Sequence, residues 1–287
     1  MTSPYALTVR APRDIGYDIA EQLGFDEMKE ALAVSIFDEG EHAVSVQALY
    51  EMEVTAKAAQ TDIPAHLEST VAQLPDEDWV GLSQSGLPPI KAGRFFVHGS
   101  HDTPLDDAVF PVLVDAGQAF GTGHHGTTTG CLLMLDRLEA QGAQPTTILD
   151  LGTGAGILAI AAAKLFPNSD ILATDIDPIA VDVADANAAI NGVQFQSVTA
   201  DGFDTPALKD KTFDLIIANI LAGPLRGLAP DISAALNMSG TVILSGILDE
   251  QTESVANAFR AEGLTVTPQA SLEGWTSLLA HKSTDSA

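Results

Sequence analysis

The sequence has few basic residues, a single cysteine and no long hydrophobic run, and each shortage excludes a class of protein. Only 13 lysines and arginines stand against 39 aspartates and glutamates, so the formal charge is -26. This charge repels a phosphate backbone and argues against direct binding of nucleic acid. The one cysteine, Cys131, excludes an internal disulfide and a cysteine-based zinc site, and it fits a reducing compartment.

The apolar stretches are too short for a membrane-spanning helix. The longest, such as residues 157–163, cannot cross a bilayer. Arg10, Arg13 and Asp14 precede any long apolar run, so we expect no signal peptide. These features predict a soluble, cytoplasmic protein without a membrane partner, and we expect it to be a monomer.

The composition does provide enough apolar material for a sizeable core. Of the 287 residues, 46% are hydrophobic and 18% charged, which is typical of a folded chain, and the length favours two domains. The acidic surplus has two interpretations that composition does not separate. It attracts and steers a basic protein partner, or it only keeps the chain soluble, as in an organism with an acidic proteome.

The first part of the chain predicts a small α+β domain. Its segments follow the β-α-β-β-α-β order of the split-βαβ (ferredoxin-like) plan. They are strands at 5–10, 32–37, 42–49 and 69–74, and helices at 17–23 and 51–60. The run Pro75-Asp76-Glu77-Asp78 is a natural boundary, so we predict one domain over residues 1–74 and a second over residues 75–287.

The second domain is predicted from alternating strands and helices. Residues 79–114 are less regular, with strand-like pieces at 94–98 and 108–114. Strands then follow at 147–151, 171–174, 195–199, 213–218, 240–244, 264–268 and 275–280, and helices at 131–138, 157–165, 179–190, 225–236 and 251–262. This alternation predicts an α/β fold with a seven-stranded, doubly wound, Rossmann-like and mostly parallel sheet. The last two strands lack a helix between them, which allows an antiparallel hairpin at one edge.

A glycine-rich turn lies between the first strand and helix of this sheet. It reads D-L-G-T-G-A-G over residues 150–156. Glycines in such a turn permit unusual backbone torsions and let a ligand approach the main chain closely. The turn therefore predicts a nucleotide-like ligand that contacts Gly152 and Gly154.

The residues around this turn favour S-adenosyl-L-methionine over a dinucleotide. Ile157 stands where the dinucleotide pattern requires its last glycine, Asp150 precedes the turn, and Lys164 is the first base after it. A pyrophosphate favours a helix N-terminus without nearby acids. S-adenosylmethionine carries a sulfonium and an ammonium group and no phosphate, so carboxylates suit it. No Gly-Lys-Ser/Thr follows, which excludes a P-loop.

Two acids at the ends of the next strands are candidate cofactor ligands. Asp175 ends the second strand, where an acid accepts hydrogen bonds from ribose hydroxyls. Its alternative role, capping the next helix, already suits Asp177, which Pro178 follows. Asp201 follows the third strand and can accept from the adenine amino group, or it only forms a turn before Gly202.

Asn219 is the candidate catalytic residue because it ends the fourth strand, at the edge where ligands of this fold bind. Its amide oxygen can accept a hydrogen bond from a nucleophilic amine and aim the lone pair at the transferred methyl carbon. Asparagine is no base, so the substrate ammonium must lose its proton to water or to another group. Alternatively Asn219 caps the strand-to-helix turn, and the two roles are compatible.

The segment before the sheet is rich in glycine, histidine and hydroxyl residues. It reads F-G-T-G-H-H-G-T-T-T-G-C over residues 120–131. Such a composition predicts a flexible strap that can fold across a bound ligand, or an ordinary connector. Four histidines, two of them in this segment, could suggest a metal site: His98, His101, His124 and His125. No acid or cysteine completes a ligand set with them at a recognisable spacing, so we expect no metal there.

Three segments of the second domain form a joint signature. They are the strap, the run N-I-L-A-G-P-L over residues 219–225, and L-S-G-I-L over residues 244–248 with Gln251. Together they resemble the methyltransferases that modify large-subunit ribosomal protein eleven, the PrmA family. The resemblance extends from about Trp79 to the end of the chain, whereas the first domain is similar only in plan.

The resemblance implies a cytoplasmic bacterial enzyme that methylates lysine side chains and the N-terminal α-amine of a basic ribosomal protein. It implies a first domain that captures this substrate and moves relative to the second. The candidate cofactor-binding residues, carried over or taken from the motifs above, are Thr128, Gly152, Asp175, Asn219, Gly154, Asp150, Asp201, Phe120 and His125. Many members have proline where this chain has Gly126, which should loosen the strap.

Two other functions remain open from the sequence. The first is a methyltransferase of the same class that acts on a small-molecule amine or on another protein. The second is a nucleotide-binding module without chemistry. A dehydrogenase fits the acidic turn least well.

Overall fold

The computed structural model describes residues 4–24, 31, 33–38, 43–73, 89–100, 102, 109–114 and 125–282. The chain divides into two compact units, Met1–Leu82 and Ser83–Ala287. The predicted boundary between residues 74 and 75 lies outside the described residues.

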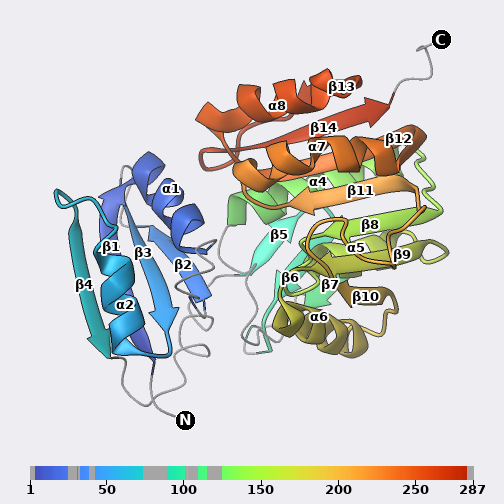
Figure 1. Ribbon diagram of the computed structural model, residues 1–287. Coiled ribbons are helices and arrows are strands. Elements are labelled where there is room, and N and C mark those ends of the chain that lie inside the picture. The colour runs from blue at the N-terminus through green and yellow to red at the C-terminus, as the bar shows by residue number, and fades with distance from the viewer. Residues whose placement is uncertain are drawn as a thin grey trace. The chain divides into compact units, whose positions relative to one another are not determined.

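The first unit is a four-stranded antiparallel sheet with two helices. Its elements are β1 (Tyr5–Pro12), α1 (Arg13–Gly24), β2 (Ala33–Asp38), β3 (Ala43–Tyr50), α2 (Glu53–Gln60) and β4 (Glu68–Gln73). The strand order is β2-β3-β1-β4, and both helices lie on one face of the sheet (Figure 1). Period-two alternation turns Leu7 and Val9 of β1 into the core, where they are fully buried.

The second unit contains a mixed seven-stranded sheet (Figure 1). Its strands are β8 (Thr147–Leu151), β9 (Asp170–Asp175), β10 (Gln196–Thr199), β11 (Phe213–Asn219), β12 (Leu236–Leu248), β13 (Leu264–Pro268) and β14 (Trp275–Lys282). Their order is β10-β9-β8-β11-β12-β14-β13, with the first five parallel and β14 antiparallel to both neighbours. The predicted seven strands and the hairpin at one edge are confirmed.

Two hydrophobic clusters cover opposite faces of this sheet. Neighbouring strand residues point to different sides, so Ile217 joins one cluster and Ile216 the other. Helices α4 (His125–Ala140) and α5 (Ile157–Leu165) pack on the first face, and α7 (Ala222–Ala235) and α8 (Thr252–Ala261) on the second. Helix α6 (Pro178–Ile190) packs beside α5, and a 3-10 turn, Asp249–Gln251, precedes α8.

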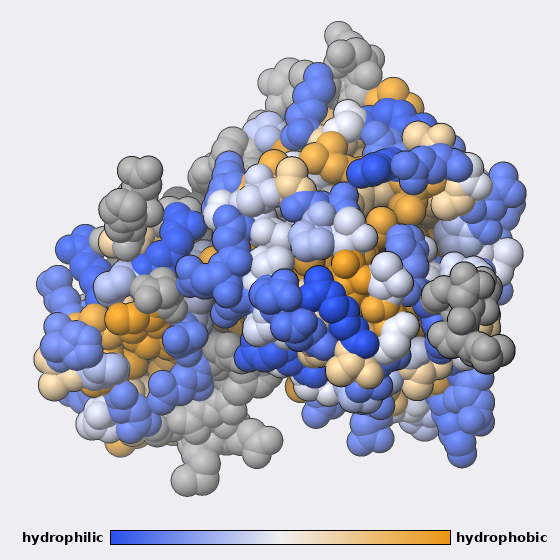
Figure 2. Space-filling model, turned by 90° about the horizontal axis from the view of Figure 1, so that it is seen from above, coloured by the Kyte–Doolittle hydropathy of each residue, from blue (hydrophilic) through white to orange (hydrophobic). Residues whose placement is uncertain are grey.

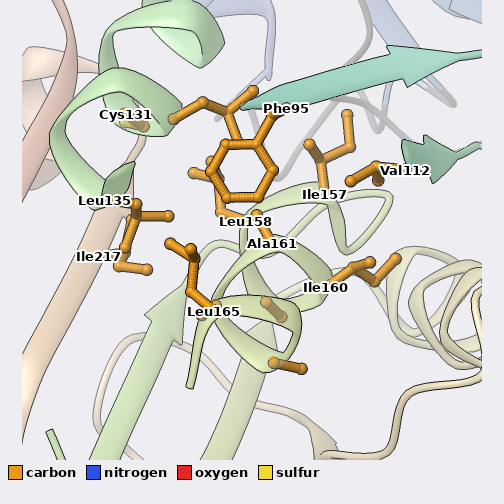
Figure 3. Packing of buried hydrophobic residues seen from close by; sticks show 14 of the residues in the cluster. Phe95, Val112, Cys131, Leu135, Ile157, Leu158, Ile160, Ala161, Leu165 and Ile217 are labelled. Atoms are coloured by element: carbon orange, nitrogen blue, oxygen red, sulfur yellow. The ribbon is translucent and has the colours of Figure 1, made fainter. Parts of the chain in front are cut away.

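A separate three-stranded sheet packs against the helices that cover the first face. It consists of β5 (Ile90–Ala92), which the sequence did not predict, β6 (Phe95–His98) and β7 (Phe110–Leu113). Figure 3 shows Phe95 over Leu158 and Val112 beside Ile157, so this sheet shares the core of α5. Arg94 ties it to α4, because its guanidinium donates to Asp136 and Glu139, each at 2.5 Å.

Helix α4 begins at His125, six positions before the predicted start at Cys131, so the last part of the predicted strap is helical. Gly126 and Gly130 lie one turn apart on the side facing the last hairpin. A Cβ on Gly126 would lie 2.7 Å from the carbonyl oxygen of Leu272, and one on Gly130 2.5 Å from Oγ of Ser277. In this chain the two glycines therefore let the first turns of α4 pack closely against the hairpin, and a side chain at either position would require its neighbour to shift. The rest of the predicted strap, residues 120–124, lies outside the described residues.

Strand β12 and helix α7 also differ from their predicted bounds. The helix predicted at 225–236 begins at Ala222 and ends at Ala235, and the strand predicted at 240–244 extends from Leu236 to Leu248. Pro224 falls within the first turn of α7, where a missing N–H costs no helical hydrogen bond.

Within the described ranges, no helix has the length and apolar character needed to cross a bilayer. Figure 2 shows one face of the molecule, on which hydrophilic residues surround smaller apolar patches. Large hydrophobic side chains that remain exposed are Met52, Val54, Val109, Leu133, Ile176, Ile179, Ile190 and Met238. Single exposed hydrophobic residues of this kind are normal in globular proteins, but Ile176 and Ile179 lie beside a candidate cofactor ligand.

Asp214 lies at the start of β11, at the edge of the sheet where the parallel strands begin, and it holds neighbouring segments together there. Its carboxylate accepts from Oγ1 and N of Thr146, from N of Thr147 and from Nδ2 of Asn237, at 2.7–3.2 Å. Partial burial acts to raise the pKa of Asp214, but these hydrogen bonds outweigh it and lower the pKa to about 2.

An Asp214→Asn variant is therefore expected to lose about 1 kcal/mol of unfolding free energy at pH 7, a value discounted for solvent exposure. The folded-state pKa lies below the unfolded one, so this stability is present above about pH 4 and is lost as the pH falls toward 2. Urea unfolding at pH 7, 4 and 3 measures it, with the exposed Asp231→Asn as control. A wild-type to variant difference that does not shrink with acid would contradict this assignment.

Candidate functional site

Strands β8, β9, β10 and β11 are parallel, so their carboxyl ends lie along one rim of the sheet. The chain proceeds from β8 through β9 to β10 on one side, and continues from β11 to β12 on the other. The order therefore reverses between β8 and β11, which is where ligands bind in open α/β sheets. The described candidates on this rim, apart from Thr128 in α4, are Asp150, Gly152, Gly154, Asp175, Asp201 and Asn219.

The glycine-rich turn needs its glycines for conformation and for packing. Gly152, Gly154 and Gly156 all have left-handed torsions, with φ of +74°, +54° and +83°. The N–H groups of Gly152 and Thr153 donate to the carbonyl oxygen of Thr174, at 2.8 and 2.9 Å, which fastens the turn to β9. A Cβ on Gly156 would lie 3.0 Å from Cβ of Ala184 in α6. The turn is thus held rigidly by its neighbours on both sides.

Asp150 lies beneath this turn and not on its surface, with 1% of its area exposed. Its Oδ2 accepts from Oγ1 of Thr153 at 2.7 Å and from N of Ala159 at 3.0 Å. Burial raises the pKa of Asp150 to about 7, against the lowering effect of these two hydrogen bonds. Its Oδ1 is buried and has no hydrogen-bond partner among the described residues, so it is an unsatisfied acceptor beneath the turn.

Asp175 and Asp177 divide the two roles that the sequence suggested for acids at the end of β9. Asp177 caps α6, with its Oδ1 accepting from N of Ile179 at 2.8 Å and Pro178 at the first helical position, as predicted. Asp175 instead accepts from N of Gly154 at 2.8 Å and from N of Asp177 at 3.1 Å. Desolvation raises the pKa of Asp175, and the backbone hydrogen bonds oppose that rise. The Asp175 carboxylate therefore lies against the glycine-rich turn.

Asn219 is the last residue of β11 and pairs in register with Ser245 of β12. The alternative role as a helix cap is not realised, because the residue at the cap position of α7 is Leu221 and no side chain caps that helix. Asp201 follows β10, is exposed, and forms a turn in which N of Asp204 donates to its carbonyl oxygen at 3.0 Å. This turn agrees with the turn-forming interpretation and leaves the carboxylate available to a ligand.

The first turn of α4 brings polar groups to the same region. Thr127 and Thr128 are buried, with 5% and 4% exposed. Oγ of Ser245 donates to the carbonyl oxygen of Thr127 at 3.2 Å and shares a hydrogen bond of 2.9 Å with Oγ of Ser277. This network joins α4 to β12 and β14. Of the other candidates in the strap, Phe120 lies outside the described residues, and so does the side chain of His125.

The described residues contain no group of three histidine, cysteine or acidic side chains that could hold a metal. His98 stacks on Phe96 with ring centroids 5.1 Å apart, and its Nδ1 lies 3.0 Å from the carbonyl oxygen of Gly99. His101 and His124 lie outside the described residues.

Sequence reasoning missed an apolar element of the rim. Ile176 directly follows Asp175 and is 60% exposed, and Ile179 is 47% exposed. An exposed isoleucine beside a candidate ribose acceptor offers an apolar surface to a flat ring system. The signal was an isoleucine between two aspartates, in a loop where polar residues are usual.

Comparisons with known proteins agree with this fold. The model of the family described as ribosomal protein L11 methyltransferase (PrmA) matches residues 17–283. A Brucella suis protein with the name ribosomal protein L11 methyltransferase is 45% identical over 276 residues, 94% of this chain and 95% of that protein. A Mesorhizobium japonicum protein of the same name is 43% identical over 269 residues, 90% of this chain and 92% of that protein.

A solved structure shows the same likeness in three dimensions. The crystal structure of ribosomal protein L11 methylase from Lactobacillus delbrueckii subsp. bulgaricus is 32% identical and has a TM-score of 0.60. The aligned region covers 68% of this chain and 98% of the chain in that crystal structure. This likeness confirms the predicted α/β methyltransferase fold. The chain belongs to the ribosomal protein L11 methyltransferase (PrmA) family.

Proposed function

We propose that this protein is an S-adenosyl-L-methionine-dependent N-methyltransferase that modifies lysine side chains and the N-terminal α-amine of ribosomal protein L11. The observation that carries the proposal is the meeting of the glycine-rich turn with the end of β11 at the reversal of strand order. Ligands of open α/β sheets bind at this reversal, so a cofactor held by the turn would have Asn219 within reach of the methyl group that it supplies. The activity named for the relatives agrees with this arrangement.

The residues on the rim suit a cationic cofactor without phosphate. Asp175 is fixed against Gly154 of the turn and can accept from ribose hydroxyls, and Asp201 is exposed at the end of β10. Beneath the turn, Oδ1 of Asp150 is a buried acceptor without a partner among the described residues. Lys164, the first base after the turn, donates to the carbonyl oxygen of Pro111 at 2.6 Å from the far end of α5. The local field is therefore acidic, which favours a sulfonium over a pyrophosphate.

In the proposed reaction, the protein orients the substrate amine and provides the electrostatic field of its acidic side chains. When bound, S-adenosylmethionine supplies a methyl group activated by a positively charged sulfur. Asn219 accepts a hydrogen bond from the substrate amine through its amide oxygen and so directs the nitrogen lone pair. Asparagine takes no proton, so the substrate ammonium loses its proton to water before attack. The acids on the rim favour binding of the cation.

The first unit is proposed to hold the substrate. Its β-α-β-β-α-β order and strand order β2-β3-β1-β4 correspond to the ferredoxin-like plan, which leaves one sheet face without helices. A formal charge of -26 suits a basic ribosomal protein that has not yet bound RNA. We assign substrate capture to residues 1–74, cofactor binding to residues 75–287, and the reaction to the cytoplasm of a bacterium.

Labelling tests the proposal directly. A lysate from cells that lack this protein is incubated with the purified chain and S-adenosylmethionine radiolabelled on the methyl group. Label is expected in one small protein of the large ribosomal subunit, and mass spectrometry of L11 is expected to show added methyl groups on amines. Label in RNA or in small-molecule amines would reject L11 as the substrate.

A further inference from the structure

Ile220, the residue after Asn219, lies between two glycines from different parts of the chain. Gly152 belongs to the turn after β8, and Gly246 lies within β12, next to the partner of Asn219 in the sheet. Strand β12 is a direct neighbour of β11 in the sheet (Figure 1). Ile220 is therefore approached by both glycines, through its main chain by Gly246 and through its side chain by Gly152.

Gly246 permits a backbone contact that no other residue would allow. It has a left-handed φ of +82°, at a point where the register between β12 and β14 shifts. A Cβ on Gly246 would overlap the carbonyl oxygen of Ile220 and lie 2.7 Å from its carbonyl carbon and 3.2 Å from its nitrogen. Because these are main-chain atoms, a larger residue at 246 could be accommodated only by moving the backbone that carries Asn219.

Gly152 acts on the side chain of the same residue. It has a φ of +74°, and a Cβ there would overlap Cγ2 of Ile220. Ile220 is half-buried and packs against the hydrophobic cluster that α7 and α8 form with the sheet. Its side chain is thus seated on the turn proposed to hold the cofactor.

We propose that Gly246 is a positioning residue for the methyl transfer, which acts through Ile220 to fix the Asn219 side chain relative to the glycine-rich turn. This inference rests on the proposed function. Gly246 has no side chain and lies against the backbone of Ile220, so its replacement should affect the rate of transfer and not the affinity for the cofactor. A displacement of about 1 Å at the reacting groups can lower a rate about a hundredfold, and a partial shift costs less.

The test is a Gly246→Ala variant, with kcat for methyl transfer to L11 and the cofactor Kd measured separately. We expect kcat to fall by about tenfold or more and Kd to change by less than about threefold. Gly263→Ala is the matched control, because Gly263 has the same φ of +82° and a Cβ there would meet no atom of the described residues within 4 Å. Both variants carry the same backbone strain, and only one displaces Ile220, so Gly263→Ala should keep the wild-type kcat.

A double-mutant cycle separates positioning from a general loss of structure. On an Asn219→Ala background, Gly246→Ala should lower kcat by less than about twofold, because the group that it positions is already absent. A general defect would instead multiply with the loss at Asn219. Should Gly246→Ala fail to fold, Ile220→Ala provides the second variant, since it removes Cγ2 from its seat on Gly152. We expect it to lower kcat several-fold at unchanged Kd.

The outcomes distinguish this inference from the function on which it rests. Wild-type kcat in Gly246→Ala, or equal losses in Gly246→Ala and Gly263→Ala, would overturn the role of Gly246 and leave the reaction standing. Absence of methyl transfer by the wild-type protein would overturn both.

Discussion

An Asn219→Ala variant is expected to lose about a hundredfold in kcat while it binds S-adenosylmethionine with nearly unchanged Kd. Asn219 is the last residue of β11, at the reversal of strand order, and its side chain caps no helix. Its amide is therefore available to the substrate amine. Loss of an orienting hydrogen bond leaves the amine free to point away from the methyl group, and positioning contributes a large part of such catalysis. Single-turnover methylation of L11, together with calorimetry of the cofactor, measures the two effects separately.

Asn219→Asp is the matched variant for this experiment. It has nearly the same shape and keeps an oxygen that accepts a hydrogen bond, so it should retain more activity than alanine does. Its added charge also favours a cation on the rim. Full activity of Asn219→Ala would show that this residue does not orient the amine, and equal loss in both variants would point to the amide N–H₂ instead of the oxygen.

The second large effect is expected on cofactor binding in an Asp175→Asn variant. Its carboxylate lies against Gly154 of the turn and is proposed to accept from ribose hydroxyls. Hydrogen bonds to a charged group contribute about 2 kcal/mol, so the Kd for S-adenosylmethionine should rise about thirtyfold. Titration calorimetry measures the change, and kcat at saturating cofactor should remain close to that of the wild type.

Asp177→Asn is a close control for the loss of one negative charge. Asp177 lies two residues away and caps α6 through Ile179, a role that asparagine fills equally well. Its Kd should stay within about twofold of the wild type, the small change expected for a charge that does not touch the ligand. Equal weakening in both variants would mean that only the general field matters. Tight binding of NAD or ATP by the wild type, with no heat from S-adenosylmethionine, would reject the cofactor itself.

The strands and the turn that build the rim follow from local sequence. Strand β8 and helix α5 lie where the apolar runs predicted them, because these segments carry their own periodicity and are separated by glycines. Asp177 was predicted as the cap of α6 for a similar reason, since a cap and a proline at the next position act within one turn of helix. The signatures around Asn219 and Ser245 also indicated the family, because they are contiguous runs of residues.

Packing between distant segments decided the other features. At the start of α4, Gly126 and Gly130 lie close to Leu272 and Ser277, a contact between distant segments that no local pattern reveals. The burial of Asp150, which raises its pKa to about 7, depends on the helices and strands that cover it. The sequence showed that Asp150 directly precedes the glycine-rich turn. It did not show that the side chain lies buried beneath that turn.

By itself, the sequence determined the order of the elements in the seven-stranded sheet and the glycine-rich turn, and it favoured a cationic cofactor, because torsional preference and charge are properties of each residue and its near neighbours. Only the tertiary structure decided that Gly152 and Gly246 enclose Ile220 and that Asp175 lies against Gly154. These contacts join residues far apart in the chain, and they form only when the strands pair and the backbones come within van der Waals distance.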